Sequence, residues 1–136
     1  MAAVEIIRRA FEAFADGDRE ALIEACHPEV EIHAVTNVVA GREGAYHGPE
    51  GVGEYLDDVA RIWDSVELQP HQLVELGPGR VLVIGRVRTR RGATRLDVPN
   101  AWLWELEGER VRSVRLFVDP ETIPVLLAER DANPVA

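Results

Sequence analysis

Apolar residues recur at helical spacing in three stretches of the chain. In the first, apolar positions lie one turn apart with charged residues between them, which predicts an amphipathic helix over 3–15. The second begins after Asp18, a good N-cap, and should end at Pro28, because the residue before a proline is disfavoured in helical backbone. The third runs from Pro49 to Trp63 with an apolar stripe along one side, and it is the clearest helix signal in the sequence.

Alternating apolar and polar residues, which are typical of half-buried strands, describe much of the remaining sequence. A short strand is predicted over 30–35, followed by a glycine-containing loop. After the third helix, turn residues separate four longer strands, predicted at 66–76, 80–90, 94–107 and 110–118. Sequential strands with tight turns form an antiparallel meander, and Asp119-Pro120 then predicts a last short helix through Leu127.

Length and composition fit a single domain, 1–136. The chain has 136 residues, of which 46% are hydrophobic and 29% charged, the balance of a folded domain. Its one cysteine, Cys26, excludes an intrachain disulfide and a cysteine-built zinc site. No apolar run reaches the ~20 residues of a membrane span, and the first residues do not resemble a signal peptide. We therefore expect a cytoplasmic protein without a membrane partner.

The charges of the chain exclude further classes of function. All 15 cationic residues are arginine, so Schiff-base chemistry and a P-loop, which both need a lysine, are excluded. The net charge of −9 repels phosphate backbones, and we expect no nucleic-acid partner. No two of the four histidines lie at metal-ligand spacing on a predicted helix, so no metal site is predicted.

Five segments carry a resemblance to a known family. They are FADGD at 14–18, YHGPEGV at 46–52, LGPGRV at 76–81, PNAWLW at 99–104 and VRSVRLFVDP at 111–120. With the order of the predicted elements, they resemble the SnoaL-like (polyketide cyclase-like) branch of the nuclear transport factor 2-like superfamily. The resemblance covers about residues 4–128.

This resemblance implies a cone-shaped α+β fold, in which N-terminal helices pack on a curved, mainly antiparallel sheet and leave a conical, apolar pocket. Such a pocket would bind a small apolar or carbonyl-bearing molecule. One interpretation is an enzyme that catalyses isomerisation, dehydration, cyclisation or hydrolysis without a cofactor. The alternative is a non-catalytic ligand-binding or dimerisation module. The fold alone does not decide between them, because it hosts both kinds of protein.

The catalytic residues of two branches of the superfamily are incomplete in this sequence. Asn100 stands where the steroid isomerases have a protonated aspartate, but alanines stand at the positions of their base and tyrosine. Arg86 matches the arginine of the limonene-type epoxide hydrolases, whereas Arg88 and Leu116 replace their two aspartates. Without these carboxylates neither reaction is expected as those enzymes perform it.

Strand and helix periodicity predict which side chains face the pocket, and on the strand over 80–90 the even-numbered residues should point inward. In the catalytic interpretation, Asn100 holds a developing oxyanion, Arg86 orients the substrate, and His33 or a tyrosine hydroxyl moves a proton. The other residues expected to contact the ligand are Tyr46, Tyr55, Val59, Trp63, Ile84, Arg88, Trp102 and Leu116.

Several of these residues have a structural alternative. Strand alternation also allows His33 to face solvent or a dimer interface. Arg86 and Arg88 either bind an anionic substrate group or pair with Asp97 or Glu105 on the neighbouring strand.

The outer face of the predicted sheet carries two large apolar residues, Leu103 and Phe117. A neighbouring pair of this kind is unfavourable in water. The sequence therefore predicts a homodimer that buries this face.

Overall fold

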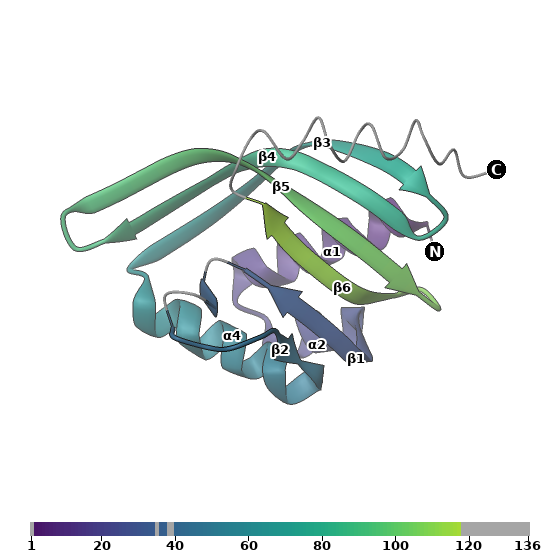
Figure 1. The fold of residues 1–136 in the computed structure, drawn as a ribbon, viewed down its shortest axis with the longest axis horizontal. Coiled ribbons are helices and arrows are strands. Elements are labelled where there is room, and N and C mark those ends of the chain that lie inside the picture. Colours follow the sequence, from purple (N-terminus) through teal and green to yellow (C-terminus); the bar gives the residue numbers. More distant parts are fainter. Residues whose placement is uncertain (1, 35, 38–39, 118–136) are drawn as a thin grey trace.

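Helices α1, α2 and α4 lie against one face of a curved sheet (Figure 1). The computed structural model describes residues 2–34, 36–37 and 40–117, without the side chain of Phe117. The helices are α1 (Ala3–Asp16), α2 (Arg19–Ala25) and α4 (Gly48–Ile62). The strands are β1 (Cys26–His33), β2 (Tyr46–His47), β3 (Ser65–Gly77), β4 (Arg80–Arg91), β5 (Thr94–Glu107) and β6 (Arg110–Phe117).

The helix ends follow from local sequence signals. Gly17 ends α1 in the left-handed conformation, with φ 64°, and its N–H donates to carbonyls of the last turn. Asp18 caps α2 as predicted, because its carboxylate accepts a hydrogen bond of 3.1 Å from the Ala21 N–H. Pro49 lies in the first turn of α4, where a missing backbone N–H costs nothing.

The sheet has the order β2-β1-β6-β5-β4-β3 in the described part of the chain. Strands β3 to β6 form the predicted antiparallel meander, and β1 pairs with β6 in parallel. β1 begins at Cys26, earlier than predicted, and its register shifts between Cys26 and Glu31, the stretch that contains Pro28. The short strand β2 lies in the predicted loop, and the helix predicted through Leu127 lies outside the described residues.

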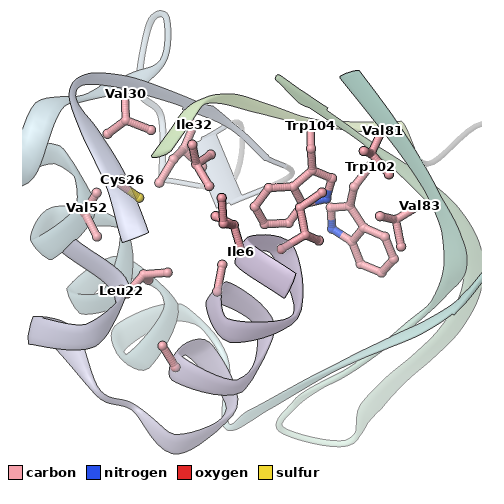
Figure 2. Close-up of a cluster of buried hydrophobic side chains, with 14 of the residues drawn as sticks. Ile6, Leu22, Cys26, Val30, Ile32, Val52, Val81, Val83, Trp102 and Trp104 are labelled. Carbon is pink, nitrogen blue, oxygen red and sulfur yellow. The ribbon is translucent and has the colours of Figure 1, made fainter. Parts of the chain in front are cut away.

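The main core lies between the concave face of the sheet and the helices (Figure 2). Val81 and Val83 of β4 belong to it and lie opposite Trp104 and Trp102 of β5. In Figure 2 both tryptophans point from the sheet toward the helices, with Ile6 of α1 nearby. The same face of the sheet also lines the cavity described below.

The predicted orientation of β4 is wrong. Its odd-numbered residues face the helices, whereas Leu82 and Ile84 pack with Ala101 and Leu103 in a second cluster. The reason is that 81–84 are all apolar, so alternation gives no inward face there. The predicted inward orientation of Arg86, which rested on the same parity, is wrong for that reason as well.

No helix in the ranges that the structure describes is long and apolar enough to cross a membrane.

Candidate functional site

A cavity of about 190 Å³ lies between the concave face of the sheet and helices α1 and α4. Its walls come from helices on one side and from β1 and β3 to β6 on the other, so the sheet and the N-terminal helices must both fold to form it. Most of the side chains around it are apolar, including Phe11, Phe14, Leu22, Ile32, Val66, Leu68, Val87, Val98 and Val114.

The structure brings seven of the eleven predicted site residues to this cavity. These are His33, Tyr55, Val59, Trp63, Asn100, Trp102 and Leu116. The other four, Tyr46, Ile84, Arg86 and Arg88, do not line it.

Aromatic rings form one wall of the cavity. Phe11 of α1 packs edge-on against Trp102, with ring centroids 5.2 Å apart, and lies at the same distance from Trp104. On the α4 side, Phe14 lies 5.9 Å from Tyr55. The rings give the cavity flat, polarisable surfaces suited to another ring.

Asn100 is the most unusual polar residue of the cavity. Its exposed fraction is 0%, and neither amide atom has a hydrogen-bond partner among the described residues. The residue opposite it on β4 is Gly85, which has no side chain to reach the amide. Trp104 Nε1 and Thr89 Oγ1, which belong to other residues lining the cavity, are likewise buried without a partner. Buried polar groups are nearly always paired, and these four atoms of the cavity wall have no partner among the described residues.

Arg86 and Arg88 pair with a carboxylate away from the cavity. Arg86 Nε donates to Asp97 Oδ1 at 2.7 Å, and Arg88 Nε donates to Asp97 Oδ2 at 3.2 Å. The Arg86 guanidinium holds the pKa of Asp97 below its usual range. This is one of the two alternatives that the sequence left open for the arginines.

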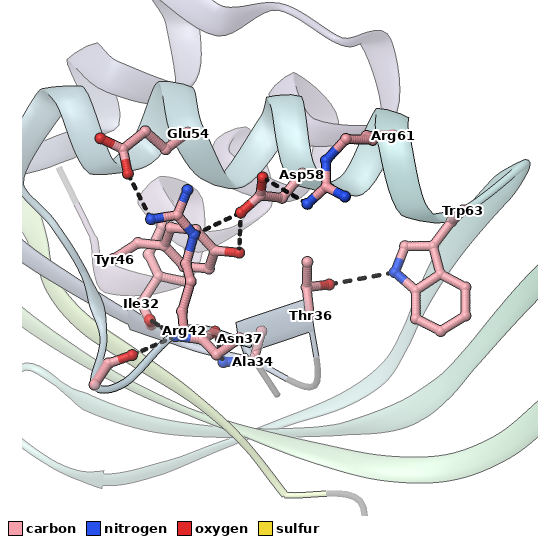
Figure 3. A network of polar contacts seen from close by, with 11 residues as sticks. Ile32, Ala34, Thr36, Asn37, Arg42, Tyr46, Glu54, Asp58, Arg61 and Trp63 are labelled. Atoms are coloured by element: carbon pink, nitrogen blue, oxygen red, sulfur yellow. Dashed lines mark hydrogen bonds and ion pairs between the residues drawn. The ribbon is translucent and has the colours of Figure 1, made fainter. Parts of the chain in front are cut away.

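Tyr46 belongs to a polar network on α4 (Figure 3). Its hydroxyl donates to Asp58 Oδ2 at 2.7 Å, and Arg42 Nε donates to the same oxygen at 2.6 Å. Arg61 donates to the other oxygen of this carboxylate. The hydrogen bond from Arg42 is the main cause that lowers the pKa of Asp58, while burial raises the pKa of Tyr46 to about 12. Through these hydrogen bonds, the segment from Arg42 to Tyr46 is held against α4, beside the cavity.

Three further hydrogen bonds involve the segment after β1. Asn37 Oδ1 accepts from the Ala34 N–H at 2.8 Å, and its Nδ2 donates to the Gly44 carbonyl at 2.8 Å. Trp63 Nε1 donates to Thr36 Oγ1 at 3.3 Å, and both residues line the cavity (Figure 3). Sequence reasoning missed Thr36, Asn37 and Asp58. The apolar stripe of α4 gave no sign that the polar Asp58 would be buried.

Burial favours the neutral form of the titratable groups among the described cavity residues. Burial, followed by the charge of Arg115, lowers the pKa of His33 from its ordinary 6.5. Burial also raises the pKa of the Cys26 thiol to about 12 and raises the pKa of the Tyr55 hydroxyl. No Asp or Glu is among the described residues around the cavity. The cavity is therefore suited to an uncharged molecule.

The described residues include no group of three His, Cys, Asp or Glu side chains that could hold a metal ion. The chemistry available from the described cavity residues is that of amide, hydroxyl and indole hydrogen bonds and of one neutral imidazole.

Comparison with known proteins gives a family match over most of the chain. The model of the SnoaL-like domain matches residues 7–114. The uncharacterized protein Rv0034 of Mycobacterium tuberculosis H37Rv is 29% identical over 122 residues, which are 86% of this chain and 89% of that protein.

Solved structures share the architecture. An NTF2-like protein of unknown function from Burkholderia pseudomallei K96243 has a TM-score of 0.77 at 22% identity, covering 93% of this chain and 98% of that one. Rv0760c from Mycobacterium tuberculosis, solved in complex with estradiol-17β-hemisuccinate, has a TM-score of 0.71 at 15% identity, covering 88% and 95%. The predicted nuclear transport factor 2-like α+β fold is thus confirmed.

Proposed function

The chain belongs to the SnoaL-like domain family, and on this premise we propose that it binds a small, neutral, largely apolar molecule bearing a carbonyl or hydroxyl oxygen. The binding site is the cavity between α1, α4 and the sheet, with the oxygen of the ligand at Asn100.

The unpaired amide of Asn100 carries this proposal. A buried polar group without a hydrogen bond costs about 1–3 kcal/mol, and Asn100 has two such atoms in an apolar wall. A ligand oxygen that accepts from Nδ2 removes part of that cost on binding. The same contact orients the ligand, while the surrounding rings supply most of the buried apolar area.

The size of the cavity agrees with a ring compound. An apolar cavity of about 150 Å³ in another protein is enough to bind benzene, and this one has about 190 Å³. The neighbour Rv0760c was solved with a steroid derivative, so a related scaffold accommodates fused rings. We propose a ligand with one ring or two, because a larger one would need the walls to move.

Catalysis without a cofactor is a second candidate function, and His33 is the observation that favours it. A neutral imidazole at the cavity can take a proton from a carbon next to a carbonyl, while the Asn100 N–H stabilises the oxyanion that forms. Isomerisation, dehydration and cyclisation all use such a step. Arg86 has no part in this scheme, because it lies outside the cavity.

A titration with 1-indanone, a bicyclic ketone, tests the binding proposal. All three tryptophans line the cavity, so their indole N–H signals in a ¹H–¹⁵N NMR spectrum should shift saturably. Val87→Trp fills the cavity and should abolish the shifts, whereas Ile84→Trp, on the opposite face of β4, should leave them unchanged. Binding that survives Val87→Trp, or no binding at the solubility limit of 1-indanone, would contradict the proposal.

We also propose that the protein forms a homodimer through the outer face of the sheet, around Leu103. Ile84 and Leu103 of this face are partly exposed, and this remaining surface is what a second copy would bury. Leu82 and Ala101 are already fully buried within one copy. The side chain of Phe117, the other residue of this prediction, lies outside the described part.

A further inference from the structure

The Asn100 side chain has a donor and an acceptor side by side. Its Nδ2 can donate two hydrogen bonds and its Oδ1 can accept two, and both atoms are buried and unpaired among the described residues. A ligand ketone can accept from Nδ2 but leaves Oδ1 without a donor. Only a ligand group with both functions satisfies the whole edge of the amide.

The described neighbours of Asn100 on β4 and β5 do not supply the missing donor. Val98 and Trp102 lie two residues before and after it on the same face of β5 and also line the cavity. Gly85 lies directly opposite on β4, and Val87 follows on that strand. On β4 and β5, the described neighbours of the amide on this face are therefore apolar side chains or glycine.

The other unpaired polar groups lie too far along the strands to complete the same pair. Thr89 lies opposite Leu96, which is four residues before Asn100 on β5, and Trp104 lies four residues after it. At about 3.3 Å per residue, each is roughly 13 Å from Asn100 along the strand. Neither group can therefore pair with Asn100 at the same point, whereas a single ligand group with a donor beside an acceptor can satisfy both of its atoms.

We infer that the ligand carries an adjacent hydrogen-bond donor and acceptor, as in a primary amide, a lactam or a neutral carboxylic acid, attached to a ring. This inference rests on the proposed binding function and specifies the class of its ligand. The two groups form a cyclic pair with Asn100, in which the ligand C=O accepts from Nδ2 and the ligand N–H or O–H donates to Oδ1. The pair forms in either orientation of the Asn100 amide.

Benzamide and acetophenone test this inference, since they differ only by an NH₂ in place of a CH₃. Isothermal titration calorimetry of the wild-type protein should give a Kd for benzamide about tenfold lower than for acetophenone, because one more buried atom is paired. In a cavity without such a partner, the order is reversed, since the amide loses more hydration than the ketone. Asn100→Leu should remove the preference for benzamide.

Each outcome of these titrations supports or overturns the inference. Equal affinities, or a preference for acetophenone in the wild-type protein, would overturn the inference and leave the proposed function standing. A preference for benzamide that persists in Asn100→Leu would also overturn it, because another residue would then provide the pairing. If neither compound binds although 1-indanone does, the inference fails alone. If none of the three binds, the proposed function fails with it.

Discussion

Two buried asparagines, Asn37 and Asn100, differ in their hydrogen bonding. Asn37 makes hydrogen bonds through both ends of its amide to the backbone around it. Asn100 makes none within the described residues. The first amide is part of the fold, and we propose that the second pairs with a ligand.

Substitution of both by leucine, which is similar in size, should separate these roles. Asn100→Leu should change the free energy of unfolding by less than about 1 kcal/mol or raise it, because two unpaired polar atoms are replaced by apolar ones. Asn37→Leu should lower it by about 2–4 kcal/mol, because backbone groups of Ala34 and Gly44 lose their partners. Urea denaturation measures both. A loss of several kcal/mol in Asn100→Leu would show that this amide is structural.

His33 should give the protein a pH dependence of defined sign. Its pKa is lowered in the folded state, so the unfolded chain binds the proton first as the pH falls. The free energy of unfolding should therefore decrease as the pH falls through 6.5, the ordinary value, and stop decreasing below the folded pKa. The difference between wild type and His33→Gln, followed by thermal denaturation from pH 8 to 5, isolates this contribution from the other histidines. No difference in slope would contradict the position of His33 at the cavity.

At the scale of elements, α4 contributes both to the cavity wall and to the polar network around Asp58. One turn of this helix carries both Tyr55, which lines the cavity, and Asp58, which binds Arg42 and Tyr46. The network holds the chain before α4 against the helix and so fixes the position of Tyr55 relative to α1.

Asp58→Asn should lower the free energy of unfolding by about 2 kcal/mol, since charged hydrogen bonds to Arg42 and Tyr46 are weakened. The pKa of Asp58 is lowered on folding, so its contribution is present above its unfolded value, near 3.8, and is lost as the pH falls through the folded value. The difference between wild type and variant should thus stay constant from pH 8 to 5 and shrink below about pH 4.

Asp57→Asn is the matched control, because this carboxylate forms an exposed ion pair with Arg19 and should cost at most about 1 kcal/mol. Equal decreases in the free energy of unfolding of the two variants would mean that the buried network stabilises the fold no more than an exposed ion pair does.

The helices and the four strands of the meander could be predicted because they have strong local signals, as in the cap at Asp18 and the turns between the strands. The two-residue strand β2 and the early start of β1 gave no such signal. The orientation of β4 could not be predicted, because an apolar run such as 81–84 looks the same from both faces. Asp58 could not be placed either, since its burial depends on Arg42, sixteen residues away, and on Tyr46. Asn100 was predicted to face the cavity, and it does. It lies two and four residues before Trp102 and Trp104, so the three side chains share one face of the strand.

At the scale of the whole molecule, the outer face of the sheet predicts a homodimer. If two copies pair through this face, light scattering at micromolar concentration should give the mass of a dimer, and Leu103→Glu should give a monomer by placing a charge in the interface. Leu96→Glu is the control, because Leu96 is 48% exposed and lines the cavity, and it should leave the dimer intact. A wild-type monomer would contradict the predicted dimer.

We propose that the cavity holds a neutral ring compound through Asn100. A crystal structure of the protein with bound benzamide tests it most directly. Density for the ring is expected beside Phe11 and Trp102, with the ligand amide about 2.7–3.2 Å from both amide atoms of Asn100. A cavity closed by side chains, or an Asn100 amide paired with protein groups while benzamide lies elsewhere, would contradict it.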